Sequence, residues 1–284
     1  WLNPLRDEDA EDEDAKEWQR FGKASHSRIL EGRDVFDTRY CVEFIAPDGC
    51  LDTKADLLKF CDDNGVTTKK SWNKPEFVNA IRTAGLNPLI YDVEAAKYAQ
   101  ETGGKQQLTE KEIRRIEIAA AMVELHPELR HFFKGGFAEV TVVWQENGIW
   151  FKARFDYLKP RAIIDLKTFT NKRNKPIDLA LHETMGGLKY HIQAWHYDKG
   201  ARKAAEFASK NMVTTYTRSG TEKLGEFLKA LAESDGHEFY FVFQKKGGAP
   251  LARGKRFRAQ LSMWKCAEAS IMQAVELYKE YSEE

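Results

Sequence analysis

The chain has 284 residues, of which 42% are hydrophobic, so it is long enough to bury one large core or two modest ones. This composition excludes a disordered or fibrous protein. Lys plus Arg equals Asp plus Glu at 44 each, so the chain as a whole does not attract phosphate. Any affinity for nucleic acid must therefore come from local basic patches.

Membrane and export signals are not evident in the sequence. No run approaches the roughly 18 consecutive apolar residues that a membrane span needs. Residues 1–16 are acidic, whereas a secretory signal starts with basic residues and continues with apolar ones. The four cysteines form no CxxC pair, which favours reduced thiols over a zinc or iron–sulphur site. We therefore expect a cytoplasmic protein without a membrane partner.

The first predicted elements are helical. Residues 5–18 form a dense acidic run, which is typical of a solvated loop or of the start of a helix. Apolar residues recur at helical spacing between residues 17 and 30, and this helix would carry His26 on a face near the core.

A helical insertion is predicted over residues 50–100, inside a single domain that spans residues 1–284. Two short amphipathic segments, residues 54–62 and 75–84, predict a helix-loop-helix over about residues 53–84, with residues suited to helix starts at both segments. No internal repeat is evident in the chain.

This helix-loop-helix is similar to helix-extended-helix modules that contact nucleic acid. Its linker contains the basic pair Lys69 and Lys70, which would provide that contact. A merely structural insertion is the alternative interpretation.

The second half of the chain changes from helical to strand periodicity. Residues 109–125 predict a helix that opens with a capping box. Three strands rich in Val, Ile, Phe and Trp follow, and Asn-Gly between the first two indicates a hairpin. The later elements are a helix, a strand, a basic loop and a final helix. The predicted ranges are strands 139–144, 149–155 and 162–168, a helical stretch that begins after Pro176 and runs through 190–203, strand 239–243 and a helix from about 257 to 280. This order predicts an α/β fold with a mixed central sheet flanked by helices.

Three residues carry the chemical signal. Asp165 and Lys167 are two positions apart on a predicted strand, so their side chains project to the same face. Asp156 follows the preceding predicted strand, at a point where the hairpin partner can bring Asp165 close to it. Because Asp165 lies in a mostly apolar strand, its charge requires a partner or a function.

Two adjacent carboxylates repel each other unless a cation lies between them. Mg²⁺ fits this need, because it binds one or two carboxylates and completes its shell with water and substrate phosphate. Such an ion polarises a phosphodiester and activates water, while Lys167 would position that water or offset charge on the reacting phosphate. An ordinary surface pair, with Asp156 capping a turn, is the alternative.

The motifs around these residues resemble the PD-(D/E)XK nuclease superfamily. The strings FDYL (residues 155–158) and IIDLKT (residues 163–168) resemble its D…(D/E)xK core. FGKASH (residues 21–26) resembles the helix with the family histidine, and GGFAEVTV (residues 135–142) the segment with its glutamate. YHIQAWHY (residues 190–197) resembles the QxxxY helix. The ordered set is most similar to the RecE-like, exonuclease VIII-type phage recombination exonucleases.

The resemblance implies a role for each matched residue. Asp156 and Asp165 would be metal ligands, His26 an additional ligand, and Glu139 a ligand or the support of one. Lys167 would be the catalytic lysine. Gln193 and Tyr197 would orient DNA or the catalytic residues, and the alternative for these two is a packing pair one helical turn apart. His26 and Glu139 also have an alternative, as a structural histidine and an exposed strand residue.

Local basic residues beside the predicted catalytic strand and near the carboxyl terminus are candidates for phosphate contact, since glycines in the second stretch would let phosphates approach its backbone. Together with the insertion pair, the DNA-binding candidates are Arg161, Lys172, Arg173, Lys245, Lys246, Arg253, Lys255, Lys69 and Lys70.

The resemblance implies a Mg²⁺-dependent exonuclease, with Mn²⁺ as a substitute, that degrades double-stranded DNA from an end. By resemblance it would act 5′ to 3′ and leave 3′ overhangs for recombination, beside a single-strand annealing protein, as a homo-oligomer in a phage or bacterial host cytosol. No iron–sulphur cluster is expected, because only one cysteine follows the core motif. The alternatives are an endonuclease or single-strand nuclease with the same core, and a DNA-binding scaffold without turnover.

Overall fold

The computed structural model describes residues 13–69, 71–171, 173–213, 221–245, 249–258 and 260–282. The chain divides into two compact units. The sheet unit combines the residues up to Val35 with Arg115–Glu284, and the helical unit is Phe36–Arg114. No helix in the described ranges is long and apolar enough to cross a membrane.

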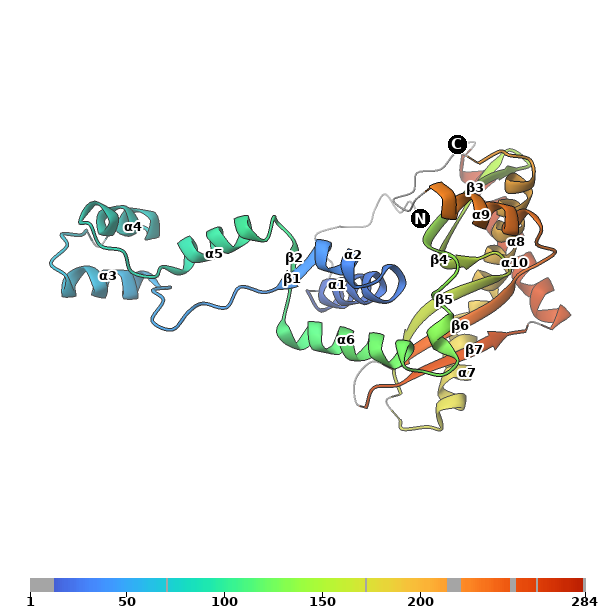
Figure 1. The fold of residues 1–284 in the computed structure, drawn as a ribbon, viewed down its shortest axis with the longest axis horizontal. Helices are drawn as coiled ribbons and strands as arrows, with labels where there is room; N and C mark the ends of the chain where they lie inside the picture. Colours follow the sequence, from blue (N-terminus) through green and yellow to red (C-terminus); the bar gives the residue numbers. More distant parts are fainter. Residues whose placement is uncertain are drawn as a thin grey trace. The chain divides into compact units, whose positions relative to one another are not determined.

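The sheet unit is built on a five-stranded mixed sheet (Figure 1). Its strands, in spatial order, are β3 (Phe137–Glu146), β4 (Ile149–Lys159), β5 (Ala162–Phe169), β6 (Glu238–Lys245) and β7 (Ala252–Phe257). β3, β4 and β5 form an antiparallel meander, β6 is parallel to β5, and β7 is antiparallel to β6. The predicted mixed α/β fold is therefore confirmed.

Helices surround this sheet in the same unit. They are α1 (Glu13–His26), the π-helical turn Ser27–Glu31, the 3₁₀ turn Leu129–His131, α7 (Ile177–Gly187), α8 (Tyr190–Ser209), α9 (Thr221–Ala232) and α10 (Leu261–Ser282). Two further helices, α2 (Arg33–Arg39) and α6 (Glu110–Glu124), cross the boundary between the units.

Two apolar clusters cover the two faces of the sheet. On one face, buried side chains of β3, β4 and β6 pack against α8 and α9. The contact with α8 is close, since a Cβ added at Gly200 would lie 2.8 Å from Cβ of Ala153. On the other face, Ile164 and Leu166 pack with Leu30 and Val123, which belong to the π-helical turn and to α6. The sheet is thus held between helices on both sides, as apolar strands require.

The carboxyl-terminal part differs from the prediction. The predicted basic loop after β6 is wrong over Ala252–Phe257, which form the edge strand β7, and the final helix starts at Leu261 rather than at residue 257. Charged residues are common on edge strands, where they discourage pairing with other chains, so basic composition there does not indicate a loop. The strand with Asp156 also runs on to Lys159, so Asp156 lies inside it and not at its end.

The helical unit contains α3 (Lys54–Asp63), α4 (Lys74–Thr83) and α5 (Tyr91–Glu101). It also contains two short parallel strands, β1 (Tyr40–Val42) and β2 (Gln106–Leu108). α3 and α4 agree with the predicted helix-loop-helix to within a residue at each end. Their apolar faces meet in a core of Leu57, Cys61, Phe77, Ile81 and Ile90.

The helical unit also contains an internal repeat, in which a second segment follows the first at an offset of 20 positions, so the expectation of no repeat is wrong. Residues 53–66 and 73–86 have the same helix bounds, the same capping box at the start and a glycine of positive φ after the helix. The buried positions correspond as well, with Leu57 and Cys61 matched by Phe77 and Ile81. The repeat is hidden in the sequence because its core residues differ in type although their positions are kept.

Candidate active site

The candidate site lies where β4 and β5 separate. Their ladder begins at the turn and its last pair is Tyr157 with Ile164, so Asp156 and Asp165 occupy the next opposed positions. The amide of Leu166 donates instead to the side chain of Asp156, at 2.7 Å from Oδ2. Strand separation therefore creates the space between the two carboxylates.

Asp165 is completely buried and is held from two sides. Lys167 Nζ lies 2.7 Å from its Oδ2, as the alternation of side chains along a strand predicts. Gln193 on α8 donates to its Oδ1 at 2.8 Å. Apart from the ion pair with Lys167, Oδ2 has no hydrogen-bond partner of good geometry among the described residues. A buried carboxylate oxygen that is incompletely satisfied is a candidate ligand for a cation.

Glu139 occupies a strained position in β3. The register of the hairpin places it opposite Asp156, between the pairs Ala138 with Tyr157 and Val140 with Phe155. Its φ is 55°, which is left-handed and unusual for a glutamate inside a strand. Such a conformation costs on the order of 1–3 kcal/mol and persists where function constrains the backbone. Its carboxylate is 2.6 Å from Arg154 Nε.

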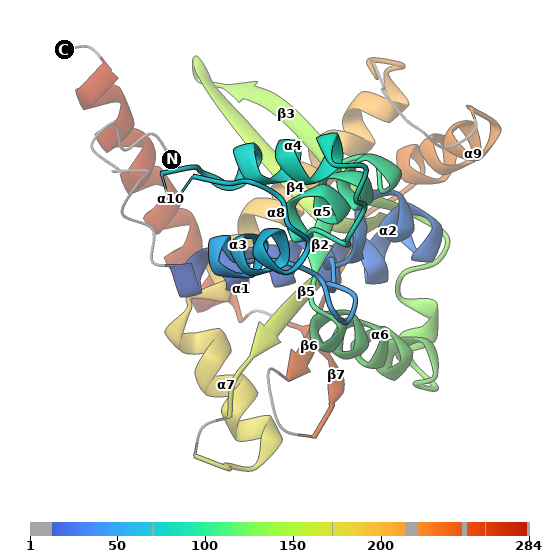
Figure 2. The same cartoon turned by 90° about the vertical axis from the view of Figure 1, so that its left-hand side faces the viewer.

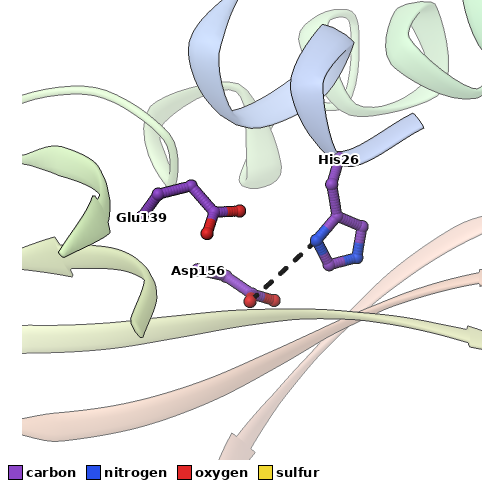
Figure 3. Close-up of side chains that lie close together, drawn as sticks. All are labelled: His26, Glu139 and Asp156. Carbon is purple, nitrogen blue, oxygen red and sulfur yellow. Dashed lines mark ion pairs between the residues drawn. The ribbon is translucent and has the colours of Figure 1, made fainter. Parts of the chain in front are cut away.

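His26 completes a group of three potential metal ligands, one imidazole and two carboxylates. One ligand atom from each of His26, Glu139 and Asp156 lies within 4.8 Å of the other two (Figure 3). His26 ends α1 and directly precedes the π-helical turn Ser27–Glu31, a distortion that is frequent at functional sites. Its Nδ1 is 4.0 Å from Asp156 Oδ1.

The protonation of these groups reflects burial. Desolvation raises the pKa of Asp156 to about 6, against partial compensation from the charge of Lys167. Desolvation and the neighbouring charge of Asp156 raise the pKa of Asp165 to about 7, although Lys167 lowers it. Desolvation lowers the pKa of His26, which favours the neutral imidazole that a metal ion requires.

The donor set fits a divalent metal ion. The carboxylates of Glu139 and Asp156 supply the oxygen ligands that Mg²⁺ prefers, and the imidazole of His26 also suits Mn²⁺ and other transition metals. The carboxylate of Asp165, which pairs with Lys167, is not one of this close group of three. Burial raises the pKa values of Asp156 and Asp165 although Lys167 lowers both, so a bound cation would add charge compensation that the single lysine does not complete.

Two side chains beside the site were missed by the sequence analysis. The ring of Tyr190, at the start of α8, lies under Lys167 Nζ, with 5.2 Å between the nitrogen and the ring centroid. Arg154 pairs with Glu139 at the rim. Tyr190 stands three residues before Gln193 and so shares its helix face, which is the signal that could have identified it. Tyr197 packs on Phe155 and is hydrogen-bonded to Gln193.

The predicted DNA-binding residues lie on separate elements. Arg161 is in the β4–β5 turn, Lys245 ends β6, and Arg253 and Lys255 belong to β7. Lys255 pairs with Asp178 at 2.5 Å. Arg173 follows β5 and Lys69 lies in the loop between α3 and α4, whereas Lys70, Lys172 and Lys246 fall outside the described residues. A role for these residues in DNA binding stays a prediction.

Burial of Asp156 leads to a stability prediction. Its folded pKa of about 6 exceeds its usual value of 3.8, so the folded state binds the proton more tightly, and stability falls as pH rises through this window. Asp156→Asn keeps an oxygen for the Leu166 amide but cannot ionise. Without metal at pH 8, we expect it to be more stable than wild type by about 2–3 kcal/mol, or about 5 °C or more in Tm.

The measurement is thermal unfolding in EDTA at pH 8 and pH 4, where the difference should disappear at the lower pH. Asp178→Asn is the control, because this exposed carboxylate has a lowered pKa and its removal should bring no gain. A wild-type Tm equal to or above that of Asp156→Asn at pH 8 would contradict the predicted cost of burying the charged Asp156 carboxylate.

The fold and the site together define a protein of the PD-(D/E)XK class, in which acidic residues and a lysine gather where two sheet strands separate. The chain belongs to the family of PDDEXK-like domains of unknown function (DUF3799), whose model matches residues 67–218, slightly more than half of the chain. The predicted superfamily is therefore confirmed. The match includes Glu139, Asp156, Asp165 and Lys167, and it begins after the amino-terminal helix that carries His26.

The comparison of structures finds a crystal structure described as "Putative exonuclease" from Eubacterium rectale. The TM-score is 0.40 and the identity 14%, over 76% of this chain and 70% of the other. A likeness of this degree does not transfer an activity. No curated protein matches the chain in sequence.

Proposed function

We propose that this protein is a metal-dependent exonuclease that hydrolyses double-stranded DNA from an end. The observation that carries the proposal is the meeting of Asp156, Asp165 and Lys167 at the separation of β4 and β5, with His26 and Glu139 beside Asp156. By the family resemblance, cleavage runs 5′ to 3′ and leaves 3′ overhangs for recombination.

Each residue of the site has a task in this proposal. His26, Glu139 and Asp156, whose ligand atoms lie close together, hold the metal ion, which is Mg²⁺ or, as a substitute, Mn²⁺. By the family resemblance Asp165 is a further ligand. When bound, this ion supplies Lewis-acid polarisation of the phosphodiester and a lower pKa for water. Lys167 is held by Asp165 and by the ring of Tyr190, so its ammonium is positioned to orient water and to offset charge on the phosphate.

Gln193 acts through Asp165. Its amide donates to Oδ1 and so fixes the carboxylate plane, while Tyr197 contacts Gln193 from the next turn of α8. This arrangement favours a positioning role for both residues, as the resemblance implies, over a merely structural packing pair.

The proposed context includes partners that the site alone does not identify. By resemblance we infer a single-strand annealing protein as the recipient of the overhang, a homo-oligomeric assembly, and action in a phage or bacterial host cytosol. Size measurement by light scattering, with and without a DNA end, tests the assembly.

The test of the activity compares linear duplex, covalently closed duplex and single-stranded DNA, each incubated with the protein in Mg²⁺, in Mn²⁺ and in EDTA. Loss of linear duplex DNA but not of closed circles, with metal and not in EDTA, is the expected result. Cleavage of closed circles would make the protein an endonuclease, and degradation of unpaired strands alone a single-strand nuclease. Failure to cut any substrate in Mg²⁺ or Mn²⁺ would favour a DNA-binding scaffold.

The helical unit gives a separate prediction. If its α3–α4 loop contacts phosphates, the double variant Lys69→Gln, Lys70→Gln should weaken DNA binding equally for all sequences. The salt slope, which is the slope of the logarithm of the binding constant against the logarithm of salt concentration, should become smaller in magnitude by about one to two, because fewer counterions are released. Titration at several salt concentrations measures the slope. The control is Arg82→Gln with Lys97→Gln, two exposed cations of the same unit. An unchanged slope would leave the unit with a purely structural role.

A further inference from the structure

The β3–β4 hairpin has two unlike faces. Along β4, Ala153 and Phe155 are buried against α8, whereas Trp150, Lys152 and Arg154 alternate with them and are exposed. β4 pairs with β5 only over its last three residues, so most of the hairpin is a two-stranded arm (Figure 2). Its exposed face is therefore available to a partner.

The exposed side chains of β4 form a line that ends at the candidate site. Trp150, Lys152 and Arg154 are spaced by two residues, so they project to one face at intervals of about 6.8 Å, and Arg154 reaches the site through its contact with Glu139. This interval is close to the distance between neighbouring phosphates of an extended nucleic acid strand. We call the side chains of Trp150, Lys152 and Arg154 the hairpin strip.

The exposed face of the hairpin carries positive charge. The residues opposite the hairpin strip on β3 are Gln145, Val143 and Thr141, so the face carries two cations and no acid until Glu139 at the site itself. In a chain with equal numbers of acidic and basic residues, such a separation is a local basic patch beside the candidate catalytic carboxylates.

Trp150 differs from the other described tryptophans because most of its side chain is exposed. It is 68% exposed, whereas the other tryptophans whose side chains the structure describes are buried or half-buried. A large exposed aromatic ring on a rigid strand offers a flat apolar surface, and such rings in nucleic acid channels stack on unpaired bases.

We propose that the hairpin strip binds one strand of the DNA substrate, unpaired for about three nucleotides next to the scissile phosphate. Arg154 and Lys152 hold successive phosphates, and Trp150 stacks on a base. The inference rests on the proposed nuclease function and adds the path and the single-stranded state of the substrate at the site.

Arg154 links the hairpin strip to the site. Its Nε is 2.6 Å from Glu139, yet the side chain is 62% exposed, so the other nitrogens of the guanidinium remain open to a phosphate oxygen. The planar fork thus spans a proposed metal ligand and the substrate backbone, which places a fixed cation beside the reacting phosphate.

The test measures the affinity of the full chain for a fluorescent single-stranded oligonucleotide and for a blunt duplex, without added metal so that nothing is cut. Trp150→Ala should weaken the single strand about tenfold or more and the duplex much less, since only unpaired bases stack. Lys152→Gln should lower the salt slope by about 0.7 for the single strand, which corresponds to one phosphate contact. Arg154→Gln should weaken both substrates.

The matched controls are Tyr281→Ala, an exposed aromatic residue on α10, and Lys229→Gln, an exposed lysine on α9, and both should bind as the wild type does. Equal affinities of Trp150→Ala and wild type for the single strand would overturn the proposal. The proposal would also be overturned if the hairpin-strip variants lost self-association but kept their affinity for DNA. The hairpin strip would then bind a second copy of the chain and not the substrate.

The two hypotheses fail separately. If wild type cuts no DNA in Mg²⁺ or Mn²⁺, the proposed function fails, whatever the hairpin strip binds. If wild type cuts DNA but Trp150→Ala and Lys152→Gln bind normally, only the hairpin strip is refuted.

Discussion

Asp165→Asn is expected to reduce DNA hydrolysis by about a thousandfold while DNA binding is largely kept. The substitution preserves size but removes the buried charge that Lys167 and Gln193 hold in place. It therefore removes a proposed metal ligand and the ionic partner of the proposed catalytic lysine in one step. The phosphate contacts proposed for the hairpin strip do not involve this residue.

The measurement is single-turnover cleavage of linear duplex DNA in Mg²⁺, beside DNA affinity without metal and a circular dichroism spectrum. The thermal shift on adding Mg²⁺ gives a second readout, because a ligand that binds the folded state stabilises it. This shift should be smaller in Asp165→Asn than in wild type. Asp198→Asn, on α8 and paired with Arg202, should match wild type in every assay. Near-normal turnover of a folded Asp165→Asn protein would show that the site is assigned to the wrong residues.

The centre of the site could be predicted because it depends on local geometry. Asp165 and Lys167 must share a face of any strand that contains both, and the structure places their charged atoms 2.7 Å apart. Asp156 could be placed nearby because a short turn makes its strand an antiparallel neighbour of the next. Neither inference required long-range information beyond the pairing of adjacent strands.

Other parts of the site depend on features that the sequence does not display. The positive φ of Glu139 is a backbone distortion set by its surroundings, and no glycine or asparagine marks the position. The DNA contact proposed for Trp150, Lys152 and Arg154 can be inferred only when the buried and exposed faces of the hairpin are known. Before that, the three residues are ordinary members of a strand.

Two fold errors also have physical causes. The basic composition of β7 and its Gly254 indicate a loop, yet β7 lies at the edge of the sheet, where one side of the strand needs no partner strand. The repeat of the helical unit was missed because Leu57 and Phe77, or Cys61 and Ile81, are alike in burial and not in identity. A pattern of caps and glycines would have identified it sooner than a search for identical residues.

Lys167→Arg is expected to lower the single-turnover rate by at least roughly a hundredfold, the size typical of losing one acid–base or electrostatic group. The Lys167 ammonium is confined between the carboxylate of Asp165 and the ring of Tyr190, and its side chain is only 21% exposed. A guanidinium keeps the charge, but its broad planar fork cannot occupy the position of a compact ammonium. DNA affinity should change little, because the overall charge is the same.

Lys167→Gln is the comparison that separates charge from geometry, and Lys229→Arg on α9 is the control for the same exchange on an exposed surface. Both Lys167 variants should be slow if the position of the ammonium matters, and the control should be as fast as wild type. A Lys167→Arg rate near that of wild type, together with a slow Lys167→Gln, would mean that the site requires only a positive charge beside Asp165. In that case Lys167 would offset charge on the phosphate and would not orient water, because a displaced guanidinium can do the first and not the second.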